Sequence, residues 1–170
     1  MRRALLERLG LRFNPSLVVG EDGALIAEMM RNASRVAHPD AVACCYVNRG
    51  DSAMHNADDT HVRQRLFSQI DAASLIDGSI RRYEAATGQT APASVAGLKN
   101  VYLYFAMTKA LTNGCVEDVV ERMNRFGLFP FPCVGPESNY HGVKWKIIHF
   151  MMMRSRLWIL LSKIYRMIKK

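Results

Sequence analysis

One run of apolar residues in the middle of the chain constrains the fold more than any other feature. Its members recur in steps of three and four residues, the spacing that places side chains on one face of a helix. They are Val62, Leu66, Ile70, Ala73, Ile76, Ile80 and Tyr83. Gly88 and Pro92 interrupt this pattern, and helical patterns resume at 95–111, at 116–126 and from about 143 to the end. The second half of the chain is therefore expected to contain helices only.

A single stretch of the sequence favours a strand. Before it, we expect a short helix over residues 2–9, a loop and a helix that starts at Glu21. Residues 35–48, RVAHPDAVACCYVN, are then apolar at both alternating sets of positions, which is typical of a strand buried on both faces. Because one or two strands do not form a stable sheet alone, the partners must come from an upstream domain, a second copy or a partner chain. The expected fold is mostly α with one or two strands.

The composition favours a folded cytoplasmic protein. The chain of 170 residues is long enough for one domain with a core, and 49% of its residues are apolar. Its start, MRRALLERLG, lacks the apolar run of a signal peptide. The four cysteines form no C-x-x-C pair, so we expect reduced thiols and neither a zinc site nor a disulfide framework. The protein is expected to be cytoplasmic, either free or at the inner face of the membrane.

The net charge of +8 is concentrated at the C-terminal end, after the last acidic residue, Glu137. The cations beyond that residue are Lys144, Lys146, Arg154, Arg156, Lys163, Arg166, Lys169 and Lys170. The apolar runs between them are shorter than the roughly 20 residues that a spanning helix needs. We therefore predict that residues 141–170 lie on a membrane surface, with Trp145 and Trp158 at headgroup depth and the lysines toward anionic lipids.

A second interpretation of this tail stays open, in which its apolar face packs on a further domain of the protein. Nucleic-acid binding is disfavoured, because large aliphatic side chains stand between the cations and a nucleic-acid backbone does not bury them.

An acidic pair, Glu21 and Asp22, lies where a loop enters a predicted helix. The two carboxylates can simply complement the positive end of the helix dipole. Alternatively, a carboxylate held there by backbone N–H groups can act as a general base that receives a proton from a substrate hydroxyl. The residue types alone leave both interpretations open.

The residues around this pair resemble a known enzyme family. The runs LRFNPSLVVGED and YVNRGDSAMH are similar to segments in the second half of bacterial family-2 glycosyltransferases, which have the α/β GT-A fold. The matching residues are Leu11, Arg12, Phe13, Leu17, Gly20, Glu21 and Asp22, followed by Tyr46, Arg49, Ser52 and Met54. The resemblance divides the chain into an acceptor-side part of a GT-A-like catalytic domain (1–58), a helical subdomain (59–137) and a basic amphipathic helical tail (138–170). It implies that the chain is a C-terminal half without the nucleotide-binding half and its D-x-D motif.

The resemblance also implies an activity, the transfer of a sugar from a nucleotide-sugar donor to a polysaccharide or lipid-linked acceptor. Asp22 would be the general base, with Glu21 orienting it or the acceptor. Arg49 would bind the departing diphosphate, and Ser52 and His55 would add hydrogen bonds. A divalent metal, Mg²⁺ or Mn²⁺, is expected for the complete enzyme, although no ligand motif for it is evident in this chain.

A non-enzymatic alternative remains beside the enzymatic one. R-G-D-S at 49–52 is ordinary turn chemistry, and the acidic pair would then serve only its helix. His55, Asp58, Asp59 and His61 do not follow a known metal-ligand spacing, and Asp59 and Thr60 suit a helix cap. In this interpretation the chain is a helical module that associates with a membrane or a partner protein.

Overall fold

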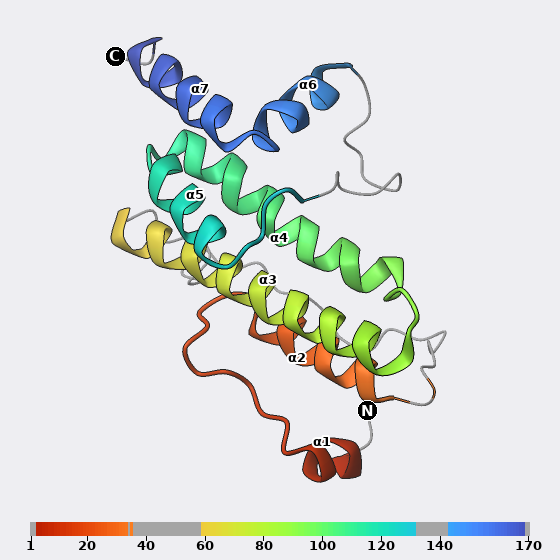
Figure 1. Cartoon of the computed structure of the whole chain (residues 1–170). Helices are drawn as coiled ribbons and strands as arrows, with labels where there is room; N and C mark the ends of the chain where they lie inside the picture. The colour runs from red at the N-terminus through yellow and green to blue at the C-terminus, as the bar shows by residue number, and fades with distance from the viewer. Residues whose placement is uncertain (1–2, 34, 36–58, 132–142, 169–170) are drawn as a thin grey trace.

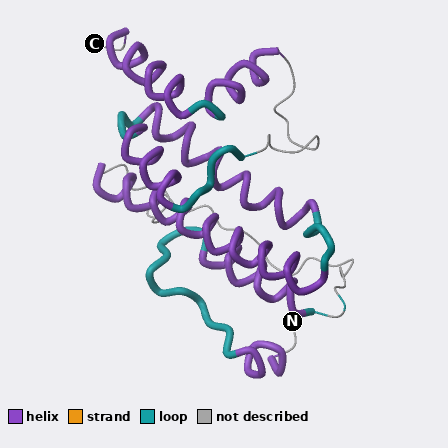
Figure 2. The backbone as a smooth tube through the Cα atoms, viewed as in Figure 1, coloured by secondary structure: helices purple, strands orange, loops and turns teal. Residues whose placement is uncertain are grey.

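The computed structural model describes residues 3–33, 35, 59–131 and 143–168, and every regular element among them is a helix. The seven helices are α1 (Arg3–Leu9), α2 (Glu21–Asn32), α3 (Asp59–Thr87), α4 (Ala93–Thr112), α5 (Val116–Arg125), α6 (Val143–Met152) and α7 (Ser155–Ile168). Figure 2 shows that the described segments between these helices are loops and turns.

The long helices α3 and α4 form the centre of the molecule. They are joined by a short loop at 88–92 and pack side by side more extensively than any other pair (Figure 1). Helix α2 lies along α3, α5 packs against both α3 and α4, and α7 in turn packs against α5 and α6. The arrangement is a helical bundle whose C-terminal pair, α6 and α7, stands at one end (Figure 1).

The apolar run that predicted the long helix also forms its buried face, so this prediction is confirmed. Leu66, Ile70, Ala73, Ile76 and Ile80 are all buried, whereas the end members of the run are partly buried. They pack against buried residues of α4 and α5, among them Leu103, Met107, Val119 and Met123. This burial of large aliphatic side chains supplies the main apolar stabilisation of the fold.

The predicted α/β fold of a GT-A fragment is wrong. The described residues contain no strand and no sheet, and their core is made by helix packing on helix. The physical reason lies in α3 and α4, whose apolar faces cover each other and need no sheet as a base. Residues 36–58, which hold nearly all of the predicted strand, lie outside the described residues. The division of the chain at 58 and 137 stays a prediction.

The tail is helical, as predicted, and residues 153–154 separate α6 from α7. One detail of the prediction is wrong. Trp158 is buried at 1% exposure, and its Nε1–H donates a hydrogen bond to the Met107 carbonyl oxygen at 3.3 Å. The indole therefore anchors α7 on the bundle and does not reach a headgroup region. Within the described part of the chain, no helix combines the length and apolarity required to cross a bilayer.

Candidate functional site

The acidic pair occupies the first turn of α2, as predicted, but neither residue is the N-cap. Gly20 holds that position with a φ of 88°, and no side chain caps it. Asp22 Oδ1 instead accepts a hydrogen bond of 2.7 Å from the backbone N–H of Gly23. The carboxylate thus satisfies one of the free amides of the first turn. The side chain of Asp22 is exposed, whereas Glu21 is half-buried, so Asp22 is the more accessible of the two.

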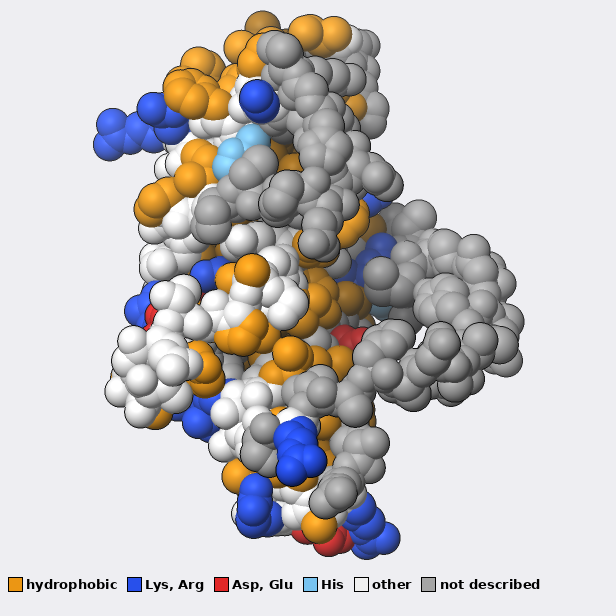
Figure 3. All heavy atoms as spheres, turned by 90° about the vertical axis from the view of Figure 1, so that its right-hand side faces the viewer, with side chains coloured by type: hydrophobic (Ala, Val, Ile, Leu, Met, Phe, Trp, Pro, Cys, Tyr) orange, Lys and Arg blue, Asp and Glu red, His pale blue; other side chains and the backbone are white. Residues whose placement is uncertain are grey.

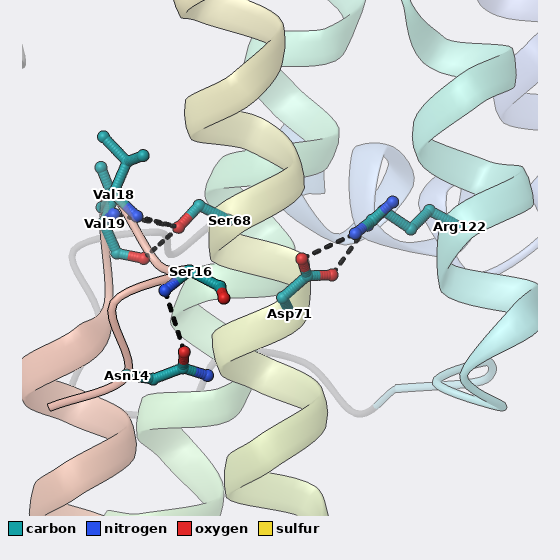
Figure 4. A network of polar contacts seen from close by, with 7 residues as sticks. All are labelled: Asn14, Ser16, Val18, Val19, Ser68, Asp71 and Arg122. Carbon is teal, nitrogen blue, oxygen red and sulfur yellow. Dashed lines mark hydrogen bonds and ion pairs between the residues drawn. The ribbon is translucent and has the colours of Figure 1, made fainter. Parts of the chain in front are cut away.

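The loop that leads into this turn is fixed on α3 by one buried side chain. Ser68 Oγ accepts hydrogen bonds of 2.9 Å from the N–H groups of both Val18 and Val19, and it donates one of 2.8 Å to the Val19 carbonyl (Figure 4). These three bonds use the full capacity of a hydroxyl, one donor and two acceptors. The start of α2 is therefore held at a defined place on the bundle.

Two glycines let α2 start in close contact with α3 and α4. A Cβ atom on Gly20 would lie 2.6 Å from the Cβ of Ala72, and one on Gly23 would lie 2.5 Å from the hydroxyl of Tyr102. Real side chains do not approach so closely, and the positive φ of Gly20 adds a second reason for glycine there. The carboxylate of Asp22 therefore stands on a turn that cannot move far without breaking these contacts.

Tyr102 of α4 interacts with the acidic pair from another helix. Its pKa is raised to about 12, first by burial, then by the negative charges of Asp22 and Glu21 and by a side-chain hydrogen bond with Asp22. The phenol therefore keeps its proton at neutral pH, with its O–H beside the carboxylate of Asp22. Asp22 thus accepts a hydrogen bond from the backbone of its own helix and has the phenol of Tyr102 in α4 beside it.

Sequence reasoning missed both supporting residues. Tyr102 lies within the helical apolar pattern of residues 95–111, which by itself indicates a core residue, and its side chain does pack beside Leu17, Ala24 and Ala72. Ser68 lies in the long helix between apolar positions and carries no signal in the sequence, because its partners are about 50 residues away.

The other predicted site residues cannot be placed beside Asp22. Arg49, Ser52 and His55 all lie outside the described residues. No three His, Cys, Asp or Glu side chains come together as a metal-binding group in the part of the chain that the structure describes. The described residues around Asp22 do not fit the divalent metal that the resemblance implies, and no chemical step below passes through a metal.

A cavity of about 670 Å³ is lined by residues other than those of this turn. It is lined by residues from the start of α3 and from the turn between α4 and α5: Thr60, Val62, Arg63, Gln64, Phe67, Asn113 and Cys115. Its one charged lining residue, Arg63, forms an ion pair of 3.1 Å with Asp118. Among its described lining residues there is no carboxylate or histidine for proton transfer, so the start of α2 is kept as the candidate site.

Comparisons with models of protein families, with curated proteins and with solved structures find no match for this chain.

Proposed function

We propose that the chain acts on the acceptor side of a sugar transfer, with Asp22 as the general base. The observation that carries the proposal is an exposed carboxylate on a turn that is anchored by Ser68 and lies beside Tyr102 of α4. A carboxylate that served only the helix dipole would need neither the anchored loop nor the partner on α4. The resemblance of residues 11–55 to family-2 glycosyltransferases supplies the reaction class.

In the proposed reaction, an acceptor hydroxyl attacks the anomeric carbon of a nucleotide sugar. A bond forms between the acceptor oxygen and that carbon, the bond from the carbon to the nucleoside diphosphate breaks, and the hydroxyl proton passes to Asp22. The acceptor is a polysaccharide or a lipid-linked glycan, and the reaction takes place on the cytoplasmic side of the membrane. Arg49, Ser52 and His55 remain predicted ligands of the departing diphosphate.

Replacement of the Asp22 carboxylate by a carboxamide tests the proposal. In cells that encode the chain, Asp22→Asn in the native gene is expected to lower incorporation of the sugar into surface polysaccharide by about 10²–10⁴-fold, the usual contribution of a general base. Asp118→Asn is the matched control, since Asp118 also lies in the first turn of a helix and outside the site. Circular dichroism of both purified variants checks that they fold.

Retained incorporation in the Asp22→Asn strain would refute the assignment of the base. That outcome would favour the non-catalytic interpretation, in which the carboxylate only accepts the amide of its own helix. Equal loss in the Asp118→Asn strain would also refute the assignment, because it would show an effect on the fold or on expression and not on the chemistry.

A further inference from the structure

Helices α6 and α7 expose an unusual share of the apolar side chains. Twelve large hydrophobic side chains are exposed in the part of the chain that the structure describes, and six of them belong to these two helices. They are Ile147, Phe150, Leu160, Ile164, Met167 and Ile168, and together they are called the tail surface here. In Figure 3, apolar and basic side chains gather at the top of the molecule, where these helices lie.

The orientation of α7 is set by the face that packs on the bundle. Trp158 and Ser162 are both 1% exposed and lie against the bundle, where the indole reaches the Met107 carbonyl. Leu160, Ile164 and Met167 follow at steps of four and three residues, which places them on the far side of the helix from Trp158. The apolar stripe therefore points outward because the other face is already packed.

The charges beside the tail surface all have one sign. The exposed cations of the described tail are Lys146, Arg154, Arg156, Lys163 and Arg166, and no Asp or Glu follows Glu137 in the sequence. Lys163 Nζ and Arg166 Nη2 each lie 3.7 Å from Oε1 of Glu117 in α5. Two cations therefore pair with one carboxylate. No described carboxylate lies within ion-pair distance of the other three, and the Arg154 guanidinium stacks on the Phe150 ring at 3.7 Å. A net positive charge remains beside the apolar stripe.

We propose that the tail surface docks on the surface of a membrane that contains anionic lipids. The tail surface is chemically complementary to such a membrane. Aliphatic and aromatic side chains insert at the boundary of the acyl chains, while lysine and arginine side chains bind lipid phosphates. A second copy of the chain fits less well, because two such surfaces face to face would bring like charges together. The inference is independent of the proposed sugar transfer, and its test needs no transfer activity.

The first test is sedimentation of the full chain with vesicles. The protein is expected to pellet with vesicles of equal parts phosphatidylcholine and phosphatidylglycerol, to stay in the supernatant with phosphatidylcholine alone, and to be released by salt. The variant Arg154→Glu with Arg156→Glu is expected to bind at least about 30-fold more weakly, because each cation near an anionic surface contributes about fivefold. The matched control, Arg8→Glu with Lys109→Glu, changes the net charge equally on α1 and α4 and is expected to bind like the native chain.

A second pair of variants separates the apolar contribution from the charge. Leu160→Gln with Ile164→Gln keeps every cation and is expected to abolish pelleting. Ile26→Gln with Leu75→Gln changes similarly exposed side chains on α2 and α3 and is expected to leave pelleting unchanged. Because all four side chains are exposed, both variants are expected to fold, which circular dichroism checks.

Two outcomes would overturn the proposal. One is a native chain that stays in the supernatant with anionic vesicles. The other is an oligomer of the native chain, seen by sedimentation velocity, that Leu160→Gln with Ile164→Gln converts to a monomer without any change in lipid binding. That result would assign the tail surface to contacts between copies.

Discussion

Helices α3 and α7 carry the same kind of sequence pattern and have different surroundings. The apolar stripe of α3 is covered by α4 and α5, and α2 lies along the same helix, so Ile70 and Ile76 are fully buried. In α7 the packed face is marked by Trp158, while Leu160 and Ile164 on the other side are about half exposed. Helical spacing of apolar residues thus predicts a helix and its apolar face, but it does not predict what covers that face.

Truncation of one isoleucine in each stripe is expected to give the largest difference in stability. Ile70→Ala removes a fully buried side chain from α3 and is expected to lower the free energy of unfolding by about 2–5 kcal/mol. Ile164→Ala makes the same change on the exposed face of α7, where about 0.5 kcal/mol or less is expected. Urea unfolding of both variants measures the difference. Equal losses would mean that α7 is covered on both sides in solution.

The contact of α2 with α3 is tested by two glycines. Gly20→Ala is expected to destabilise the protein by about 2–3 kcal/mol, because the new methyl group meets Ala72 and the backbone has a positive φ. Gly97→Ala in α4 meets no atom within 4 Å and is expected to stabilise the helix by about 0.5–1 kcal/mol. Thermal unfolding of the two variants gives the signs. A neutral Gly20→Ala would show that α2 does not lie closely on α3.

Two buried serines, one in α3 and one in α7, form different kinds of hydrogen bond. Ser68 of α3 holds the N–H groups of Val18 and Val19, so Ser68→Ala leaves two amides without their partner and is expected to cost about 1–3 kcal/mol. Ser162 of α7 donates only to Ile159 of its own helix, and Ser162→Ala is expected to be nearly neutral. Hydrogen exchange of the Val18 and Val19 amides offers an independent measurement. Unchanged protection in Ser68→Ala would exclude the anchoring role.

The sequence correctly predicted the helices whose pattern depends on residues close together in the chain. The stripe from Leu66 to Ile80 predicted α3 and its buried face, and the acidic first turn predicted the start of α2. The sequence did not predict the contacts that join segments far apart in the chain. The bond from Ser68 to the loop at 18–19 spans about 50 residues, and no local pattern records it.

Resemblance and residue type led to the two errors. A match over a short stretch suggested a sheet, whereas the described helices make their own core. Trp158 was expected near lipid because tryptophan is common there, yet its Nε1–H finds a carbonyl acceptor inside the bundle. An indole, with an apolar ring and one N–H donor, suits both a membrane interface and a protein core that offers an acceptor. The tertiary packing determines which of the two environments it occupies.

The smallest effect concerns Tyr102, where α4 meets the start of α2. Its pKa of about 12 lies above the ordinary value of 10.0, so the folded protein retains the phenol proton more strongly than the unfolded chain does. The stability that this difference supplies is fully present below pH 10 and is lost as the pH rises from 10 to 12. Tyr102→Phe is expected to remove this part of the alkaline loss, measured as the urea midpoint between pH 9 and 12. Identical profiles for the native chain and the variant would mean that Tyr102 does not face the charges of Asp22 and Glu21, and the proposed base would then lack its partner on α4.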